Sequence, residues 1–162
     1  MAEPSCSRPP YVTGLESVYG SARDAGFGSA VFFDGAQPGA GLEDRARGHY
    51  RGFLGGLWEK RGAETWLKPW RVAYRRPSGG PRDLVAELRA TGHLPTQLQV
   101  DLLVDSVADP ARARQALAGA FDAPDVAEVV AFHIGDGEVL EGLLVAGRRT
   151  NGEAVFLVSL YD

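Results

Sequence analysis

The C-terminal segment 126–162 constrains the fold most strongly, because it places two hairpin signals between runs of β-forming residues. The dipeptides Asp136-Gly137 and Asn151-Gly152 each supply two consecutive residues that tolerate positive φ, as a tight type I′ turn requires. The runs on either side are rich in valine, leucine and aromatic residues. The segment therefore predicts a three-stranded antiparallel meander.

Two-residue turns also fix which residues face each other across the meander. The second turn would place Gly147 opposite Phe156 and Gly142 opposite Tyr161. An aromatic ring that folds over a cross-strand glycine offsets the cost of that glycine, which supports this register. Both faces of the meander are then largely apolar, so we expect at least partial cover on each face.

The residues before the meander complete a β-α-β-β-β unit. Residues 97–107 alternate between apolar and polar side chains, which predicts a strand. Asp109 and Pro110 are predicted as the N-cap and the first residue of a helix that continues to Phe121. We therefore predict an α+β fold, in which an antiparallel sheet of four or more strands carries its helices mainly on one face.

The glycine-rich first half gives weaker local signals. Residues 1–10 contain three prolines and little apolar surface, so we predict a disordered tail before a single domain over residues 11–162. Three glycines at four-residue spacing lie on one face of a predicted helix, which indicates close packing against another backbone or a broken helix. The predicted helices span residues 15–22, 42–61 and 83–90, and the predicted strands span residues 29–34 and 65–76.

Composition and the N-terminal sequence limit the class of protein. A chain of 162 residues fits one domain, and its single cysteine, Cys6, excludes an intramolecular disulfide and a cysteine-rich zinc site. No apolar run reaches the length of a membrane span, and the N-terminus lacks the basic and apolar regions of a signal peptide. We therefore expect a cytoplasmic protein with no membrane partner. The sequence permits a homodimer.

The net charge of −4 hides a division along the chain. Residues 60–82 contain seven basic residues and one acid, for a net charge of +6. Residues 101–141 contain nine acids and two bases, for a net charge of −7. These segments either attract one another within the fold or present opposite surfaces to partners.

The sequence contains none of the nucleotide-binding, hydrolase or metalloprotease motifs that identify an enzyme, which argues against catalysis. His133 is the best candidate for acid–base chemistry, because the pKa of histidine lies near neutrality. The predicted register places Tyr161 on a diagonal from His133, so the pair could transfer protons; the alternative is a half-buried histidine with a structural hydrogen bond. Asp101 and Asp105 would be roughly 13 Å apart on a strand, too far to share a metal ion. No cofactor and no metal site are predicted.

A run of basic and aromatic residues around positions 60–82 is the most suggestive functional feature. Alternation as a strand would put aromatic rings on one face with arginines around them. Such a surface could bind a protein partner or stack the bases of a single-stranded nucleic acid. If the rings instead pack inward, the arginines form a solvated edge or pair with the acidic half. The candidate partner-binding residues are Trp58, Trp66, Trp70, Tyr74, Arg71 and Arg75.

Three functional hypotheses follow. The first is a non-catalytic protein-interaction module, such as an accessory, inhibitor or immunity-type protein. The second is a small-molecule-binding protein or minor enzyme with a pocket near His133 and Tyr161. The third is single-stranded nucleic-acid binding through residues 60–82, against which the acidic overall charge argues. We expect another protein to be the partner.

Overall fold

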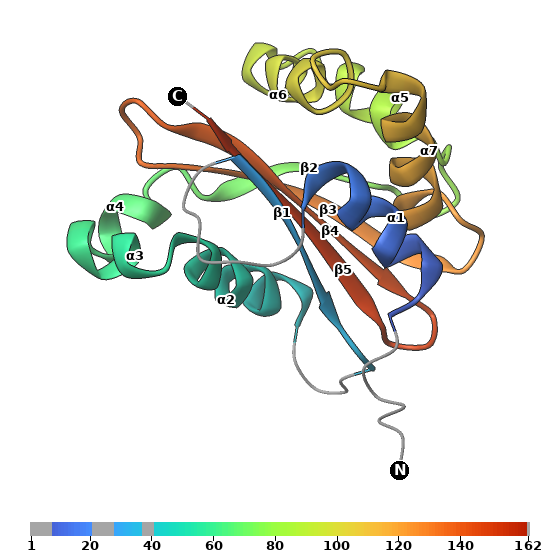
Figure 1. Cartoon of the computed structure of the whole chain (residues 1–162), viewed down its shortest axis with the longest axis horizontal. Helices are drawn as coiled ribbons and strands as arrows, with labels where there is room; N and C mark the ends of the chain where they lie inside the picture. Colours follow the sequence, from blue (N-terminus) through green and yellow to red (C-terminus); the bar gives the residue numbers. More distant parts are fainter. Residues whose placement is uncertain (1–7, 21–27, 37–40, 162) are drawn as a thin grey trace.

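A five-stranded antiparallel sheet lies between two layers of helices in the computed structural model (Figure 1). The structure describes residues 8–20, 28–36 and 41–161. The strand order is β1-β5-β4-β3-β2, so the predicted meander, β3 to β5, occupies the middle of the sheet. The strands are β1 (Gly28–Asp34), β2 (Arg71–Arg75), β3 (Val126–Gly135), β4 (Glu141–Arg149) and β5 (Ala154–Tyr161).

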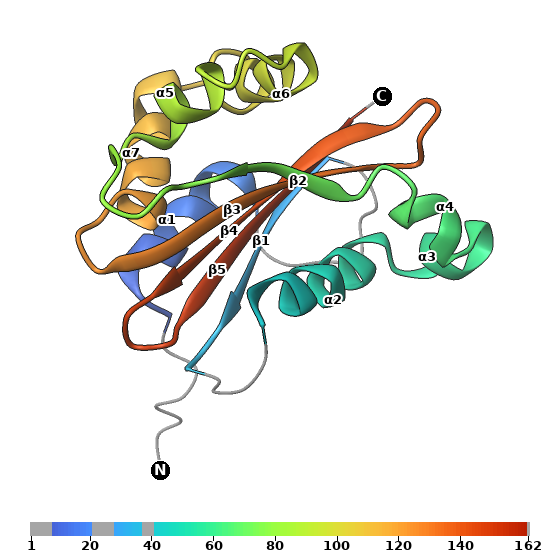
Figure 2. The ribbon, with the colours of Figure 1, turned by 180° about the vertical axis from the view of Figure 1, so that it is seen from behind.

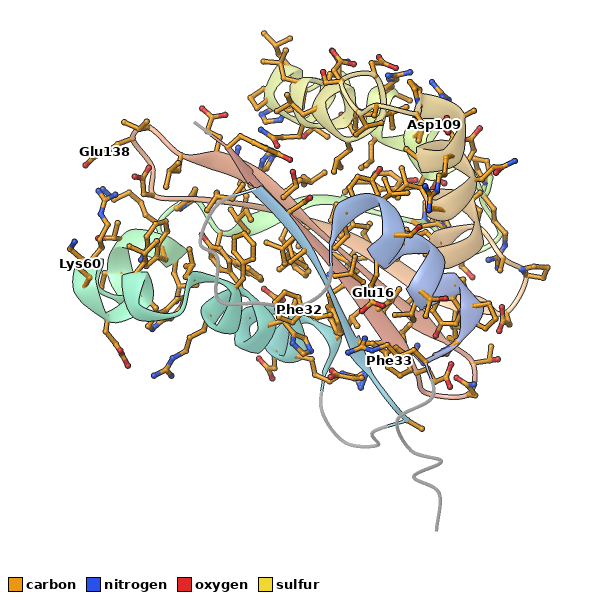
Figure 3. All side chains as sticks on the ribbon, viewed as in Figure 1. Glu16, Phe32, Phe33, Lys60, Asp109 and Glu138 are labelled. Atoms are coloured by element: carbon orange, nitrogen blue, oxygen red, sulfur yellow. The ribbon has the colours of Figure 1, made fainter. Side chains whose placement is uncertain are left out.

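Helices cover both faces of this sheet, which corrects the expectation that they lie mainly on one (Figures 1 and 2). The central strands are apolar on both sides, so each side needs a cover, and the expected partial cover of both faces is confirmed. Phe32 and Phe33 show the alternation on β1: they pack into opposite layers (Figure 3). One layer holds α2 (Leu42–Leu54), α3 (Gly56–Arg61) and α4 (Ala63–Leu67), and the other holds α1 (Pro10–Tyr19), α5 (Leu84–Arg89), α6 (Leu94–Val104) and α7 (Pro110–Phe121).

The α+β class and the C-terminal meander are confirmed, but the β-α-β-β-β unit is wrong in its first element. Residues 94–104 form helix α6, which covers most of the predicted strand 97–107. The apolar residues of this segment fit both the alternation of a strand and the spacing of a helix. The structure buries the residues that are spaced as in a helix. Its buried positions are Thr96, Gln99, Val100, Leu103 and Val104, at the three- and four-residue spacing of a helix.

Both hairpins form, although their registers differ from those expected for two-residue turns. In the first, His133 faces Leu143 across β3 and β4, because the loop spans five residues, 136–140. The Asp136 carboxylate accepts hydrogen bonds from the backbone N–H groups of the last three loop residues, which fixes this wider turn. In the second, Ala154 faces Arg148, one residue from the expected register.

The strand glycines consequently face aliphatic residues across the sheet, and the expected aromatic pairing is wrong. Gly147 lies opposite Val155, and the ring that covers it is Phe121 from α7: a Cβ atom there would lie 2.8 Å from this ring. Gly142 lies opposite Leu160, and a Cβ atom there would lie 2.0 Å from a backbone oxygen of β5. Close approach explains both glycines better than cross-strand stacking does.

Helices whose starts carry a capping residue begin where the sequence predicts. In the first half of the chain, the structure splits two predicted elements into shorter ones. The Asp109 side chain caps α7, and Asp83 caps α5. The predicted helix 42–61 is broken at Gly55, whose φ of 57° separates α2 from α3. The predicted strand 65–76 becomes α4, a turn and the short strand β2. The predicted strand 29–34 is confirmed as β1.

Two predictions concern the N-terminal region. The predicted helix 15–22 is found as α1, which begins earlier, at Pro10, so the last residue of the predicted tail is helical. The other tail residues up to position 7, including Cys6, lie outside the described residues, as do the last two positions of that predicted helix.

The edge strand β2 is short and irregular. It has five residues, four of which pair with β3, and the pairing shifts by a β-bulge between Val72 and Tyr74. Pro69 and Pro77 flank it on either side. Among the described residues, no helix has the length and apolar character needed to cross a bilayer.

Candidate functional site

A cavity of about 200 Å³ lies where the loop end of the β3–β4 hairpin meets the first turns of α6. We call it the hairpin cavity. Glu138, one of its lining residues, sits at the far end of this hairpin (Figure 3). The polar residues that line the cavity are Arg71, Gln99, His133, Glu138 and Glu141.

A row of residues across the sheet connects the cavity to the interior. Arg71 pairs with His133 between β2 and β3, His133 pairs with Leu143, and Leu143 pairs with Ser159 on β5. Directly paired residues point to the same face of a sheet. Three polar side chains therefore lie on the face that α6 covers, where Thr96 on α6 meets His133.

His133 is 7% exposed and lies among other polar groups. Its Nε2 atom is 3.4 Å from Oγ1 of Thr96, and its ring packs edge-on against His93 with 4.8 Å between centroids. Burial, the charge of Arg71 and the neighbouring His93 lower the pKa of His133 to about 4. The imidazole is therefore neutral at pH 7, so one ring nitrogen can donate a hydrogen bond and the other can accept one.

Two buried polar atoms in this region have no hydrogen-bond partner within the described part of the chain. They are Oε1 of Gln99 on α6 and Oγ of Ser159 on β5. Native proteins pair the large majority of such atoms, so each exception calls for an explanation. Gln99 lines the hairpin cavity, which makes its amide oxygen an acceptor beside a hollow.

The charges at the cavity are only partly matched within the chain. Asp136 and Glu138 both lie near Arg61, at 2.8 and 3.9 Å. Arg71 and Glu141, in contrast, take part in no ion pair with another described residue. One positive and one negative group thus line the same cavity without an ion-pair partner among the residues that the structure describes.

A second hollow adjoins the first along the outer side of α6. It is a groove of about 400 Å³ that shares Gln99 and Glu141 with the hairpin cavity. We call it the α6 groove. Its remaining lining residues are Leu98, Asp101, Leu102, Val139 and Tyr161. His133 and Tyr161 therefore line neighbouring hollows, and the structure does not bring them together in one.

Large apolar side chains are exposed on α6 and at the β3–β4 hairpin. Leu94 and Leu98, one helical turn apart on α6, are 63% and 51% exposed, and Val139 at the hairpin is 66% exposed. Sequence reasoning missed this surface because it assigned residues 97–107 to a strand. The available signal was that α6 is apolar on more than one side, which leaves part of its apolar surface outside the core.

The aromatic candidates do not share one exposed face. Trp66 is fully buried and donates from Nε1 to the carbonyl of Leu57. Trp70 is half-buried and stacks on Phe132 with 4.7 Å between ring centroids. Trp58 is also half-buried and packs edge-on against Tyr50.

The remaining candidates of the basic and aromatic run lie on β2. Tyr74 packs with the opposite helical layer and donates from its hydroxyl group to Glu87. Arg71 and Arg75 are exposed, and Arg75 pairs with Glu128 at 3.3 Å. The aromatic rings thus pack inward, which is the alternative weighed against an exposed binding platform.

The opposite charges of the two halves attract one another within the fold. Arg61 pairs with Asp136, and Arg76 pairs with Asp122 as well as with the nearer Glu87. Several cations of the basic segment are therefore neutralised internally and do not form one basic surface.

Within the described ranges, no three histidine, cysteine or acidic residues gather in a way that could hold a metal ion. Comparison with protein-family models, with curated proteins and with solved structures finds no match for this chain.

Proposed function

We propose that the chain is a non-catalytic protein-interaction module that binds its partner through the α6 groove. The observation that carries this proposal is the exposure of Leu98 and Val139, which both line this groove, with the exposed Leu94 one helical turn from Leu98 on α6. Scattered exposed apolar residues are ordinary, but a contiguous group with a polar rim is typical of an interaction surface. The single cysteine supports a cytoplasmic location for this module.

The chemistry of the groove specifies the partner. Its lining combines the apolar Leu98, Leu102 and Val139 with two carboxylates, Glu141 and Asp101, of which Asp101 also pairs with Arg89 at 3.3 Å. Charge complementarity favours a partner of opposite sign and speeds its encounter. We therefore infer that the partner presents a protein segment with an apolar anchor flanked by lysine or arginine.

Selection from a random peptide library on the folded chain tests this proposal. We expect the selected peptides to combine an apolar residue with flanking basic residues. Leu98→Asp should weaken their binding by at least about tenfold, which corresponds to about 1.4 kcal/mol, because it puts a charge in place of an apolar side chain that lines the groove. Asp101→Asn should reduce both the affinity and its dependence on salt.

Val72→Asp is the matched control for the groove. Val72 is 42% exposed and lies on the edge strand β2, outside the α6 groove. This variant should bind the selected peptides as the unmodified chain does. Equal peptide affinities for the Leu98 and Val72 variants, or peptides without basic residues, would contradict the proposal. A homodimer that Leu98→Asp dissociates would show that a second copy occupies the groove instead of a basic partner.

Nucleic-acid binding has less support from the geometry. Base stacking needs exposed aromatic faces. Trp66 is buried, and one face of Trp70 is already occupied by Phe132. The arginines that remain exposed near these rings do not make up a continuous stacking platform.

A further inference from the structure

We propose that the hairpin cavity binds a small zwitterion of amino-acid size, with a carboxylate that faces Arg71 and an ammonium group that faces Glu141. This inference goes beyond the protein-interaction function and does not depend on it. It assigns a ligand class to the hairpin cavity, which shares Gln99 and Glu141 with the α6 groove but is not lined by Leu98.

The first support is the pair of unmatched charges. Arg71 and Glu141 line one cavity, yet no ion pair joins them to each other or to another described residue. Other charges on the same strands are matched: Arg75 on β2 and Arg148 on β4 both pair with Glu128, at 3.3 and 3.2 Å. A ligand with one negative and one positive group would match both free charges at once.

The second support is the buried amide of Gln99. The residue is 6% exposed, its Oε1 atom has no partner among the described residues, and its side chain lines the cavity between α6 and the hairpin. An ammonium group has three donors, so it could bind both this oxygen and the carboxylate of Glu141. The unmatched acceptors of the cavity thus favour an amine.

His133 and the cavity walls add selectivity. The buried imidazole is neutral at pH 7, so it provides hydrogen bonding without adding a second positive charge beside Arg71. Pro69, Pro95 and Ile134 supply apolar wall surface. The volume of about 200 Å³ lies below the range of about 300–1,000 Å³ that drug-sized ligands occupy, which limits the ligand to a small molecule.

Calorimetric titration with free amino acids tests the assignment. The panel contains the protein amino acids together with β- and γ-amino acids, and each compound is paired with its carboxamide and its N-acetyl derivative. The carboxamide lacks the group for Arg71, and the N-acetyl derivative lacks the group for Glu141. We expect at least one amino acid to bind saturably, and both of its derivatives to bind at least about tenfold more weakly.

Two variants assign each ligand group to its residue. Arg71→Ala should weaken binding of the amino acid about tenfold or more, and it should abolish the preference over the carboxamide. Glu141→Gln should likewise weaken binding of the amino acid, and it should abolish the preference over the N-acetyl derivative. Gln99→Leu should weaken binding of the amino acid by a similar factor, because it removes the amide oxygen while it keeps the approximate shape of the side chain.

Arg75→Ala and Glu128→Gln are the matched controls, because both residues lie outside the cavity and pair with each other. Their affinities for the amino acid should equal that of the unmodified chain, and circular dichroism should show that every variant is folded. The proposal is overturned if no member of the panel binds saturably below about 10 mM. It is also overturned if the Arg71 and Glu141 variants retain both preferences. Neither result would bear on peptide binding at Leu98, so the two proposals fail separately.

Discussion

His133 shows how the sheet and the helix that covers it together set the protonation state of one side chain. β2 supplies Arg71 as its cross-strand neighbour, and the start of α6 supplies His93 and Thr96 above it. Burial of the histidine disfavours its protonated form most, and the charge of Arg71 and the neighbouring imidazole of His93 add to this effect. The folded chain therefore holds this imidazole neutral in a pH range where an unfolded chain would protonate it.

The first prediction concerns the pH dependence of stability. The unfolded pKa of histidine is about 6.5, and the folded pKa of His133 is lowered to about 4. Between these values the unfolded state binds more protons, so the stabilisation is complete above about pH 6.5 and is lost as the pH falls towards 4. Urea titrations at about pH 7, 6 and 5 should show this loss, with a slope of at most about 1.4 kcal/mol per pH unit for one proton.

His133→Gln provides the comparison. This variant should have a smaller loss of stability between about pH 6.5 and 5, whatever its stability at pH 7. An unchanged slope in the variant would show that His133 does not carry the effect.

The residues of the candidate site differ in how far their sequence reveals them. His133 is identifiable, because it is a titratable residue within an apolar strand. Its neighbours Thr96 and Gln99 are not identifiable, since they reach the site only through the helical form of α6. Tyr161 was expected beside His133, but the wider first loop and the shifted second hairpin place it at the neighbouring groove.

Among the elements, α6 is the one whose secondary structure is hardest to predict from the sequence, and it contributes most to the two candidate sites. Leu98, Val100, Leu102 and Val104 alternate as they would on a strand, so the sequence supports two secondary structures. The surroundings select the helix, because Val100, Leu103 and Val104 then pack into the layer that α1 and α7 complete. Leu98 is left on the outside, where it lines the groove.

The second prediction compares two leucines of α6. Leu103 is 3% exposed, so Leu103→Ala should lower the free energy of unfolding by about 2–5 kcal/mol. Leu98 is 51% exposed, so Leu98→Ala should change it by no more than about 0.5 kcal/mol. Urea denaturation of both variants measures the difference, and a larger loss for Leu98 would support the strand interpretation.

Other elements could be identified because their signals are local. The capping residues Asp83 and Asp109 mark the starts of α5 and α7 whatever the rest of the chain does. Hairpin registers are less local: a dipeptide marks where a turn lies, but the surrounding contacts set its length. The Asp136 carboxylate with its three backbone donors lengthened the first loop, and nothing in the dipeptide indicates this network.

For the molecule as a whole, electrostatics joins the basic segment to the acidic half. Arg76 is the centre of this connection: its side chain is 7% exposed and donates hydrogen bonds to Glu87 and Asp122 and to the carbonyl of Phe121. It thereby ties the end of β2 to α5 and to the end of α7. The charge division along the sequence indicated such an attraction, although it could not identify the residues that pair.

The third prediction compares neighbouring arginines. Arg76→Met should lower the free energy of unfolding by about 3–5 kcal/mol, because it leaves two carboxylates with little solvent and no cation. Arg75→Met should lower it by only about 0–1 kcal/mol, since the Arg75–Glu128 pair is largely exposed. Thermal or urea denaturation distinguishes the two variants. Equal losses would mean that the buried cluster does not stabilise the contact of β2 with α5 and α7.

The irregular edge of β2 also affects how copies of the chain behave at high concentration. A long, flat outer strand can extend its ladder into a neighbouring molecule and start a fibril. Here five residues with a bulge, two prolines at the flanks and two exposed arginines interrupt any such ladder. At high concentration, copies of the chain would repel one another along this edge. The edge beside the hairpin cavity therefore stays accessible to solutes and does not become an interface between molecules.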